Sequence, residues 1–205
     1  MNKETVQNIA IGENITAFAA SIDRLRFIIR YATAPHSSKE SVAEHSYYVA
    51  AYVLKLAHYY DFDVEKALIL ALLHDYAEAY ISDVPHPIKK QNPALEEALE
   101  AAEKKVLIDH LSSDFADLIE EFNHGTSPEG LICQLADVMS VVSYAKYEME
   151  LGNSSYMRQV YEKTQPRYIE LIAKLDQYLV PAYKGTSGKI QAQIDQIFNT
   201  RIENK

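Results

Sequence analysis

Two histidines and two aspartates stand where ionisable side chains are costly. His74 and Asp75 end one apolar run, Asp137 lies inside another, and His45 falls near the start of a predicted helix. Charged groups in apolar surroundings are unfavourable unless they are paired or bound to a metal. Two imidazoles and two carboxylates suit a divalent first-row metal that keeps positions open for water. The residue types therefore indicate a metal centre, although a core His74, a helix-capping Asp75 and an Asp137 paired with a lysine would explain them too.

The elements that must position these residues are predicted to be helices. Glycine and proline are scarce in the first 80 residues, and apolar residues recur at helical spacing, with no convincing strand, repeat or low-complexity tract. Ser41 and Glu44 have the spacing of a capping box, so we expect Glu44 to bond the Ser41 backbone rather than take part in catalysis. The chain is predicted to be an all-α bundle forming one domain over residues 1–205. The expected helices cover residues 15–30, 41–60, 64–79, 93–111, 114–122, 127–151, a stretch beginning at Pro166, and 190–202, with an irregular segment at 80–92.

Charge and composition restrict the class of partner. The chain has 20 basic and 29 acidic residues and a formal net charge of −9, which argues against binding nucleic acid through its phosphates. A phosphate-bearing small molecule would need a local cation, either a metal ion or a placed arginine or lysine. A single cysteine excludes an internal disulfide and a Cys-pair zinc module. We read no signal peptide or membrane span, and expect a cytoplasmic protein.

The order of the motifs resembles the HD superfamily of metal-dependent phosphohydrolases, and most closely its bacterial 5′-deoxynucleotidases. The resemblance covers about residues 24–150, and the ordered set is far more specific than any one motif. The matching blocks are Arg30-Tyr31 fifteen residues before His45, Val42-Ala43-Glu44-His45-Ser46, His74-Asp75-Tyr76-Ala77-Glu78, Ser82-Asp83-Val84-Pro85-His86-Pro87-Ile88-Lys89, and Gln134-Leu135-Ala136-Asp137.

The resemblance implies that His45, His74, Asp75 and Asp137 hold one divalent ion, with cobalt, manganese, magnesium, zinc, iron and nickel not distinguished. It also assigns a catalytic role to Glu78, together with the ligand Asp75. Glu78 is predicted to lie one helical turn beyond His74 on the same face, where it could hold or deprotonate a water. A solvated carboxylate at a helix end is the plainer alternative for Glu78.

Arg30 is the candidate phosphate clamp, because a guanidinium is always charged and binds phosphate oxygens in pairs. A helix C-terminal charge facing the dipole is its alternative role, and Lys89 is a weaker clamp candidate that could equally be solvated. The resemblance makes Asp83 the contact to the sugar 3′-hydroxyl, with an Asx-turn as its alternative role. The other residues predicted to line the substrate pocket are Tyr31, Val84, Pro85 and His86.

Three positions depart from the family pattern. Tyr31 replaces a tryptophan implicated in rejecting ribose, which puts strict 2′-deoxy selectivity in doubt. His86 replaces a threonine, so the pocket can differ in shape, and Ser82 replaces a glycine, which we interpret as a backbone matter.

The sequence therefore predicts a metal-dependent hydrolase that removes the 5′-phosphate from (deoxy)nucleoside 5′-monophosphates through a metal-activated water. One alternative is a deoxynucleoside triphosphate triphosphohydrolase on the same fold, although no extra Lys/Arg cluster stands near the motifs. A second is a non-catalytic nucleotide-binding protein. The resemblance also implies a homodimer.

Overall fold

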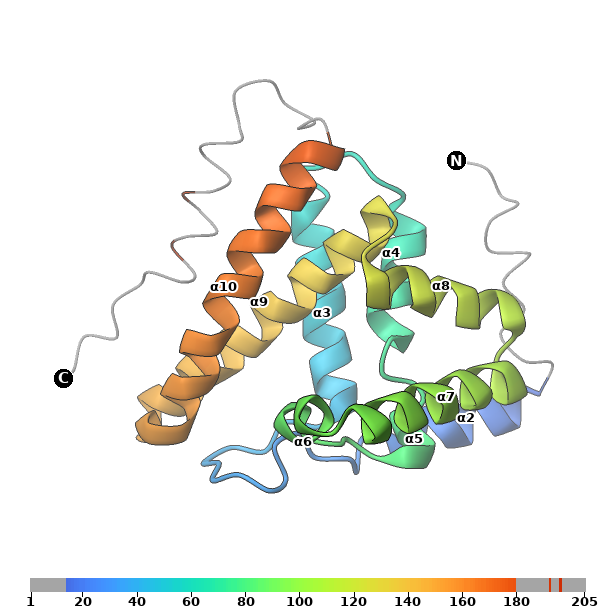
Figure 1. Ribbon diagram of the computed structural model, residues 1–205, viewed down its shortest axis with the longest axis horizontal. Coiled ribbons are helices and arrows are strands. Elements are labelled where there is room, and N and C mark those ends of the chain that lie inside the picture. The colour runs from blue at the N-terminus through green and yellow to red at the C-terminus, as the bar shows by residue number, and fades with distance from the viewer. Residues whose placement is uncertain (1–13, 180–191, 193–195, 197–205) are drawn as a thin grey trace.

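The computed structural model describes residues 14–179 together with 192 and 196. Every regular element in this part of the chain is a helix, apart from one isolated antiparallel bridge between Ile29 and Ser41, so the all-α prediction is confirmed. The predicted helix at 190–202 lies outside the described residues. The helices are α2 (Ile15–Arg24), α3 (Val42–Leu56), α4 (Val64–Leu73), α5 (Glu78–Ile81), α6 (His86–Gln91), α7 (Pro93–His110), α8 (Ser113–His124), α9 (Pro128–Glu150) and α10 (Ser154–Tyr178) (Figure 1).

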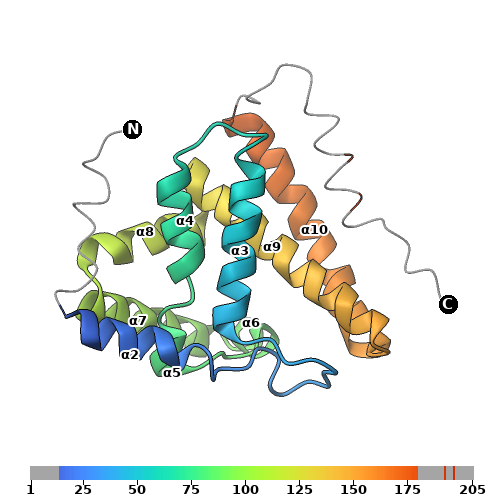
Figure 2. The same ribbon diagram turned by 180° about the vertical axis from the view of Figure 1, so that it is seen from behind.

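Helix α9 is the element against which the rest of the bundle packs. It contacts α3, α4, α8 and α10, and in both ribbon views it runs beside α10 with α3 and α4 on its other side (Figures 1 and 2). Its start follows from the sequence: Ser127 accepts a hydrogen bond from the Gly130 N–H, and Pro128 takes the first helical position. Because α9 is buried on several sides, a polar residue on it must find its partners inside the protein.

Three helices end earlier than predicted, and the second of them ends at Leu56 rather than at residue 60. The first ends at Arg24 rather than near Arg30, because the chain then turns so that Ile29 can form the bridge to Ser41. The third ends at Leu73 rather than Ala79, and a turn leads into the short α5. The turn lets Tyr76, which is 1 % exposed, stack on Phe18 of α2 with ring centroids 6.1 Å apart.

The prediction that Pro166 begins a helix is wrong, since Pro166 lies inside α10. Met157 before the proline and Leu171 and Leu175 after it are fully buried, so one apolar face packs on α9 along the whole length of α10. That burial outweighs the backbone hydrogen bond that a proline cannot donate. The segment at 80–92 is also more regular than predicted, because it contains α6.

The loop between α2 and α3 is anchored to the end of α9 by a buried carboxylate. Glu148, which is 0 % exposed, accepts hydrogen bonds from the backbone N–H groups of Ser37 and Ser38, both at 2.6 Å, and from Asn153 Nδ2 at 2.9 Å. The Tyr144 hydroxyl donates to the Ser38 carbonyl at 2.6 Å. These bonds fix a loop that would otherwise be free between its two helices.

Replacing Glu148 by glutamine should lower the free energy of unfolding by about 1–2 kcal/mol at pH 7, because an amide is a weaker acceptor than a carboxylate. Burial raises the pKa of Glu148, but hydrogen bonds from Asn153, Ser37 and Ser38 outweigh it and leave the pKa below its usual value. The carboxylate's contribution is therefore present above the unfolded pKa and is lost as the pH falls through the folded pKa.

Urea unfolding of wild type and Glu148→Gln at a series of pH values measures this. The difference between the two proteins should shrink toward acid pH, whereas a difference that stays constant with pH would contradict the assignment. Glu150→Gln, an exposed carboxylate on the same helix, is the control and should change stability by less than about 0.5 kcal/mol.

Candidate metal centre

The four residues predicted to bind a metal converge from three helices. His45 comes from α3, His74 and Asp75 follow the last turn of α4, and Asp137 comes from α9. Potential ligand atoms of His45, His74 and Asp75 all lie within 4.8 Å of one another. Asp137 Oδ1 approaches His45 Nε2 at 3.0 Å, and Asp75 Oδ2 lies 3.2 Å from His74 Nε2 and 3.8 Å from His45 Nε2. Asp137 therefore faces a histidine rather than a lysine.

Each imidazole is oriented by a partner of its Nδ1 atom, so that its Nε2 atom faces the cluster. His74 Nδ1 lies 3.0 Å from the Ala71 carbonyl, which can only accept, so Nδ1 carries the proton and Nε2 keeps its lone pair in the neutral ring. His45 Nδ1 lies 3.1 Å from the Ser140 hydroxyl. Burial and then the Arg30 charge lower the pKa of His45 to about 4, which keeps this ring neutral at pH 7. Burial lowers the pKa of His74, but Asp75 outweighs it and leaves the pKa above its usual value, so a cation would compete with a proton for His74 Nε2. Neutral imidazoles with a bonded Nδ1 are the form in which histidine binds metals.

The donor set fits a divalent cation. His45 Nε2 is fully buried and makes no hydrogen bond, even though Asp137 Oδ1 is only 3.0 Å away. Burial raises the pKa values of Asp75 and Asp137, but neighbouring histidines and Arg30 outweigh it and keep both carboxyls ionised. Such a buried lone pair beside two carboxylates is poorly satisfied by protein alone, and a metal ion would satisfy all three groups.

Arg30 lies beside this cluster rather than at a helix end. Its Nη1 donates to Asp75 Oδ2 at 3.2 Å, and its Nε lies 3.5 Å from Glu40 Oε2. Burial alone would lower the pKa of Arg30, but Tyr31, Asp75 and the other nearby acidic groups raise it, so the guanidinium stays charged. The helix-dipole alternative is wrong, since α2 ends six residues earlier.

Glu78 is carried to the site by the turn after α4, not by a continuous helix. Its Oε2 is buried and has no hydrogen-bond partner among the described residues. Burial, followed by repulsion from Asp75 and Asp83, raises the pKa of Glu78 to about 9. A carboxyl held close to other carboxylates without a partner of its own is suited to exchanging a proton with a ligand.

The segment predicted to contact the sugar lies next to Glu78. Ser82 has φ 68° and ψ 165°, a backbone region that glycine adopts readily, so the serine is strained where the family has glycine. Asp83 is half-buried and close enough to repel Glu78, whereas Lys89 Nζ lies 3.4 Å from Glu103 Oε1 of α7. Val84 and Pro85 are half-buried, and His86 begins α6, with its side chain outside the described part of the structure.

Tyr31 is held firmly against the same site. Its φ of 57° is left-handed, and its ring stacks on Tyr144 with centroids 5.5 Å apart and planes at 8°. The Arg30 guanidinium carbon lies 5.9 Å from the Tyr31 ring centroid. Strained backbone supported by packing is common at functional sites.

Three residues of this region were not predicted from the sequence: Glu40, Ser140 and Tyr144. Ser140 could have been found, because it lies three residues after Asp137 and so shares a face of the same helix. Glu40 lies in an extended segment with no motif, and Tyr144 is one of fifteen tyrosines, so neither carried a signal.

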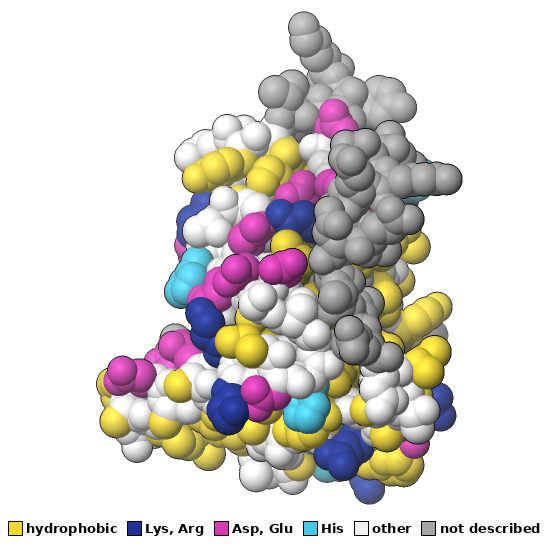
Figure 3. Space-filling model, turned by 90° about the vertical axis from the view of Figure 1, so that its right-hand side faces the viewer, with side chains coloured by type: hydrophobic (Ala, Val, Ile, Leu, Met, Phe, Trp, Pro, Cys, Tyr) yellow, Lys and Arg dark blue, Asp and Glu magenta, His cyan; other side chains and the backbone are white. Residues whose placement is uncertain are grey.

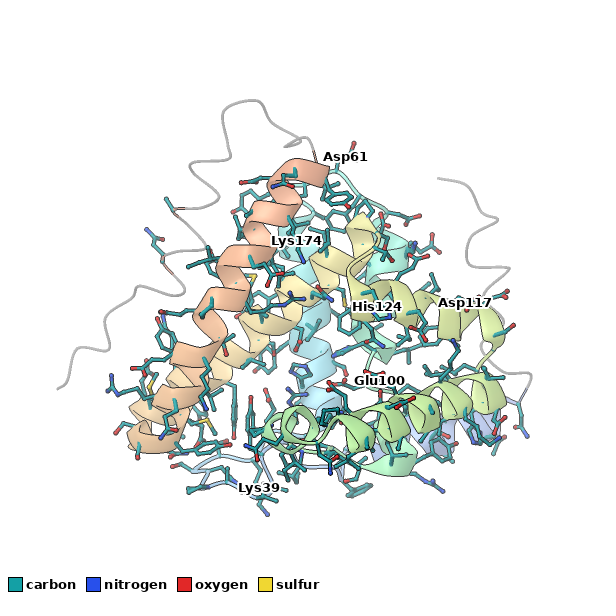
Figure 4. All side chains as sticks on the ribbon, in the orientation of Figure 1. Lys39, Asp61, Glu100, Asp117, His124 and Lys174 are labelled. Atoms are coloured by element: carbon teal, nitrogen blue, oxygen red, sulfur yellow. The ribbon has the colours of Figure 1, made fainter. Side chains whose placement is uncertain are left out.

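The outer surface is unlike this interior. On the face in Figure 3, acidic and basic side chains are interspersed among the coloured residues, with no continuous basic strip. His124, labelled at the end of α8 in Figure 4, lies on the surface and contacts Glu120 at 3.1 Å. Among the described helices, none is both long and apolar enough to span a membrane.

Comparison with known proteins identifies several relatives. Residues 17–184 match the model of the YfbR-like 5′-deoxynucleotidase family. The chain is 31% identical over 155 residues to the 5′-deoxynucleotidase PM0747 of Pasteurella multocida, covering 69% of this chain and 79% of that protein. It is 30% identical to the 5′-deoxynucleotidase yfbR of Photorhabdus temperata, covering 68% of this chain and 77% of that protein.

Solved structures share the fold. A conserved hypothetical protein from Pyrococcus furiosus superposes with a TM-score of 0.66 at 27% identity, covering 90% of this chain and 98% of the other. The cyanophage S-2L HD phosphohydrolase, solved with dA and one catalytic Zn²⁺ ion, superposes with a TM-score of 0.59 at 18% identity, covering 88% of this chain and 96% of the other. At that identity the second likeness concerns the fold alone.

Replacing Ser140 by alanine should weaken binding of Mn²⁺ about tenfold, because residues that orient a ligating histidine are typically worth 10–100-fold in metal affinity. Isothermal titration of the metal-free protein measures the dissociation constant. Ser143→Ala is the matched control: it removes a hydroxyl from the same helix that bonds Tyr52 at 2.7 Å instead of His45. Equal Mn²⁺ affinity in the two variants would contradict the role given to Ser140.

Proposed function

Because this chain belongs to the YfbR-like 5′-deoxynucleotidase family, it is a metal-dependent phosphohydrolase, and we propose that its substrates are (deoxy)nucleoside 5′-monophosphates. The observation that carries the proposal is the contact between Arg30 and Asp75 at 3.2 Å. It sets a permanent cation directly beside a ligand-rich cluster that fits a divalent ion, so one phosphate group could meet both. This local positive charge is what an anionic substrate needs in a chain of net charge −9.

The residues divide the reaction between them. His45, His74, Asp75 and Asp137 would hold one divalent ion, which supplies a Lewis acid for the phosphate and lowers the pKa of water. Arg30 would bind phosphate oxygens and offset the negative charge that grows on them. The charge of the bound cation would lower the raised pKa of Glu78, so that Glu78 would be ionised and could accept a proton from the attacking water. A new P–O bond forms as the bond between phosphorus and the nucleoside 5′-oxygen breaks, giving orthophosphate and a nucleoside.

The nucleoside would lie toward the α5–α6 segment. Asp83 would accept a hydrogen bond from the sugar, and the half-buried Val84 and Pro85 would offer apolar surface beside it. Tyr31, stacked on Tyr144, would border the sugar from the opposite loop. Lys89 already lies near Glu103, which favours a monophosphate over a triphosphate because it leaves Arg30 as the cation at the cluster.

Two further features complete the proposal. A second copy of the chain would pack on apolar residues that lie exposed on α3, among them Tyr47, Tyr48 and Leu54, to form a homodimer. The cytoplasm is the compartment that best suits a single buried cysteine and a nucleotide substrate.

The purified protein should release orthophosphate from dAMP with Co²⁺ or Mn²⁺ and lose this activity with chelator. Glu78→Gln should lower the rate at least about 100-fold while Mn²⁺ affinity stays within about threefold, because general bases contribute 10²–10⁴-fold. Parallel assays with AMP and dATP measure the sugar preference at Tyr31 and the leaving group.

Three results would contradict the proposal. Triphosphate released from dATP with dAMP untouched would assign the chain to the triphosphohydrolases. Binding of dAMP without any hydrolysis would identify a nucleotide-binding protein. Full activity of Glu78→Gln would remove Glu78 from the mechanism.

A further inference from the structure

Glu40 is a buried carboxylate that the mechanism above does not use. Its side chain is only 6 % exposed. It is not the N-cap of a helix, and it is not one of the four residues predicted to bind the metal. Its neighbour Lys39 lies at the outer edge of the molecule and is exposed (Figure 4). Successive side chains of an extended segment point to opposite sides, so the alternation sends Glu40 inward. Inside the protein its Oε2 lies 3.5 Å from Arg30 Nε.

The backbone holds Glu40 and Arg30 together. The Arg30 N–H donates to the Glu40 carbonyl at 2.9 Å, and the adjoining residues form the bridge between Ile29 and Ser41. The two residues thus close the α2–α3 loop, in which Ser37 and Ser38 are bonded to Glu148. With both ends of the loop tied down, the Glu40 carboxylate has a defined position relative to the guanidinium.

Arg30 pairs with two carboxylates, Asp75 and Glu40, and only Asp75 belongs to the predicted metal cluster. Asp75 Oδ2 contacts Arg30 Nη1 at 3.2 Å and His74 Nε2 at 3.2 Å, so the same oxygen serves both the arginine and the predicted metal cluster. A divalent ion bound there would compete with Arg30 for the Asp75 carboxylate. Glu40 contacts the other edge of the guanidinium and none of the four predicted ligands, so it stays available to Arg30.

We propose that Glu40 is a positioning residue, which holds the Arg30 guanidinium toward the bound phosphate while Asp75 is engaged by the metal. This inference rests on the proposed function, in which Arg30 binds phosphate. Glu40 acts through Arg30 and does not touch the substrate. Its removal therefore matters only as long as Arg30 is present.

A double-mutant cycle on kcat/KM for dAMP tests this dependence. In the wild-type background, Glu40→Ala should lower kcat/KM about tenfold, because the buried guanidinium loses its ion pair with Glu40 at 3.5 Å. In the Arg30→Ala background, the same change should lower kcat/KM less than about twofold. An equal loss in both backgrounds would overturn the proposal. An inactive wild type would instead count against the proposed function itself.

Two variants separate positioning from general damage to the fold. Glu40→Gln keeps the volume and one acceptor oxygen for Arg30 Nε, so its kcat/KM should lie between wild type and Glu40→Ala. Glu121→Gln removes a carboxylate that pairs with Lys66 at 2.5 Å between α8 and α4, and it should leave kcat/KM unchanged. A Glu121→Gln loss as large as that of Glu40→Ala would show that the assay reports stability alone.

A measurement without turnover gives an independent readout. In a ¹⁵N–¹H spectrum of metal-free protein, the Arg30 Nε–H signal is identified by its disappearance in Arg30→Lys. Burial raises the pKa of Glu40 to about 7 despite the Arg30 charge, so the spectrum is recorded at pH 8, where Glu40 is mostly ionised. There Glu40→Gln should shift this signal and speed its exchange with water at least about threefold, since a charged partner is replaced by a neutral one. An unchanged Nε–H signal would show that Glu40 does not hold the guanidinium.

Discussion

The structure depends on keeping an excess of carboxyl groups inside the bundle. Glu40, Asp75, Glu78 and Asp137 surround a single buried guanidinium, that of Arg30, and the His45 ring beside them is held neutral by its burial. Asp75 and Asp137 stay ionised although burial disfavours their charge, and ionised carboxylates in a protein interior need compensating charge. A divalent cation bound by the two histidines and two aspartates would supply that charge, and the same cation would attract a phosphate.

Helix α9 brings several of the groups around the cluster together. Helix α9 provides Asp137, and one turn further along it provides Ser140 to orient His45. Near its end the same helix fixes the α2–α3 loop through Tyr144 and Glu148. One buried helix therefore positions both the predicted ligand cluster and the loop that carries Arg30. Changes along α9 should thus influence metal binding and substrate binding together.

Much of this could be predicted from the sequence, because the decisive signals are local. The apolar run before His74 and the capping box of Ser41 and Glu44 each specify a helix or its start, and the structure confirms both. The helix expected over 93–111 is also confirmed, as α7. Local sequence rules did not predict the helix boundaries that tertiary packing decides. Pro166 is absorbed into α10 by burial against α9, and α4 stops at Leu73 so that Tyr76 can be buried. The long-range pair of Arg30 with Glu40 has no sequence signature, because it depends on the bridge that closes the loop.

The most direct test of the account is the position of the metal itself. Crystals grown with Co²⁺ and measured at the cobalt absorption edge would show the ion as an anomalous peak. We expect one strong peak about 2.0–2.3 Å from the Nε2 atoms of His45 and His74 and from carboxylate oxygens of Asp75 and Asp137. An ion bound elsewhere, or an empty cluster at saturating Co²⁺, would show that these four residues do not form the metal centre.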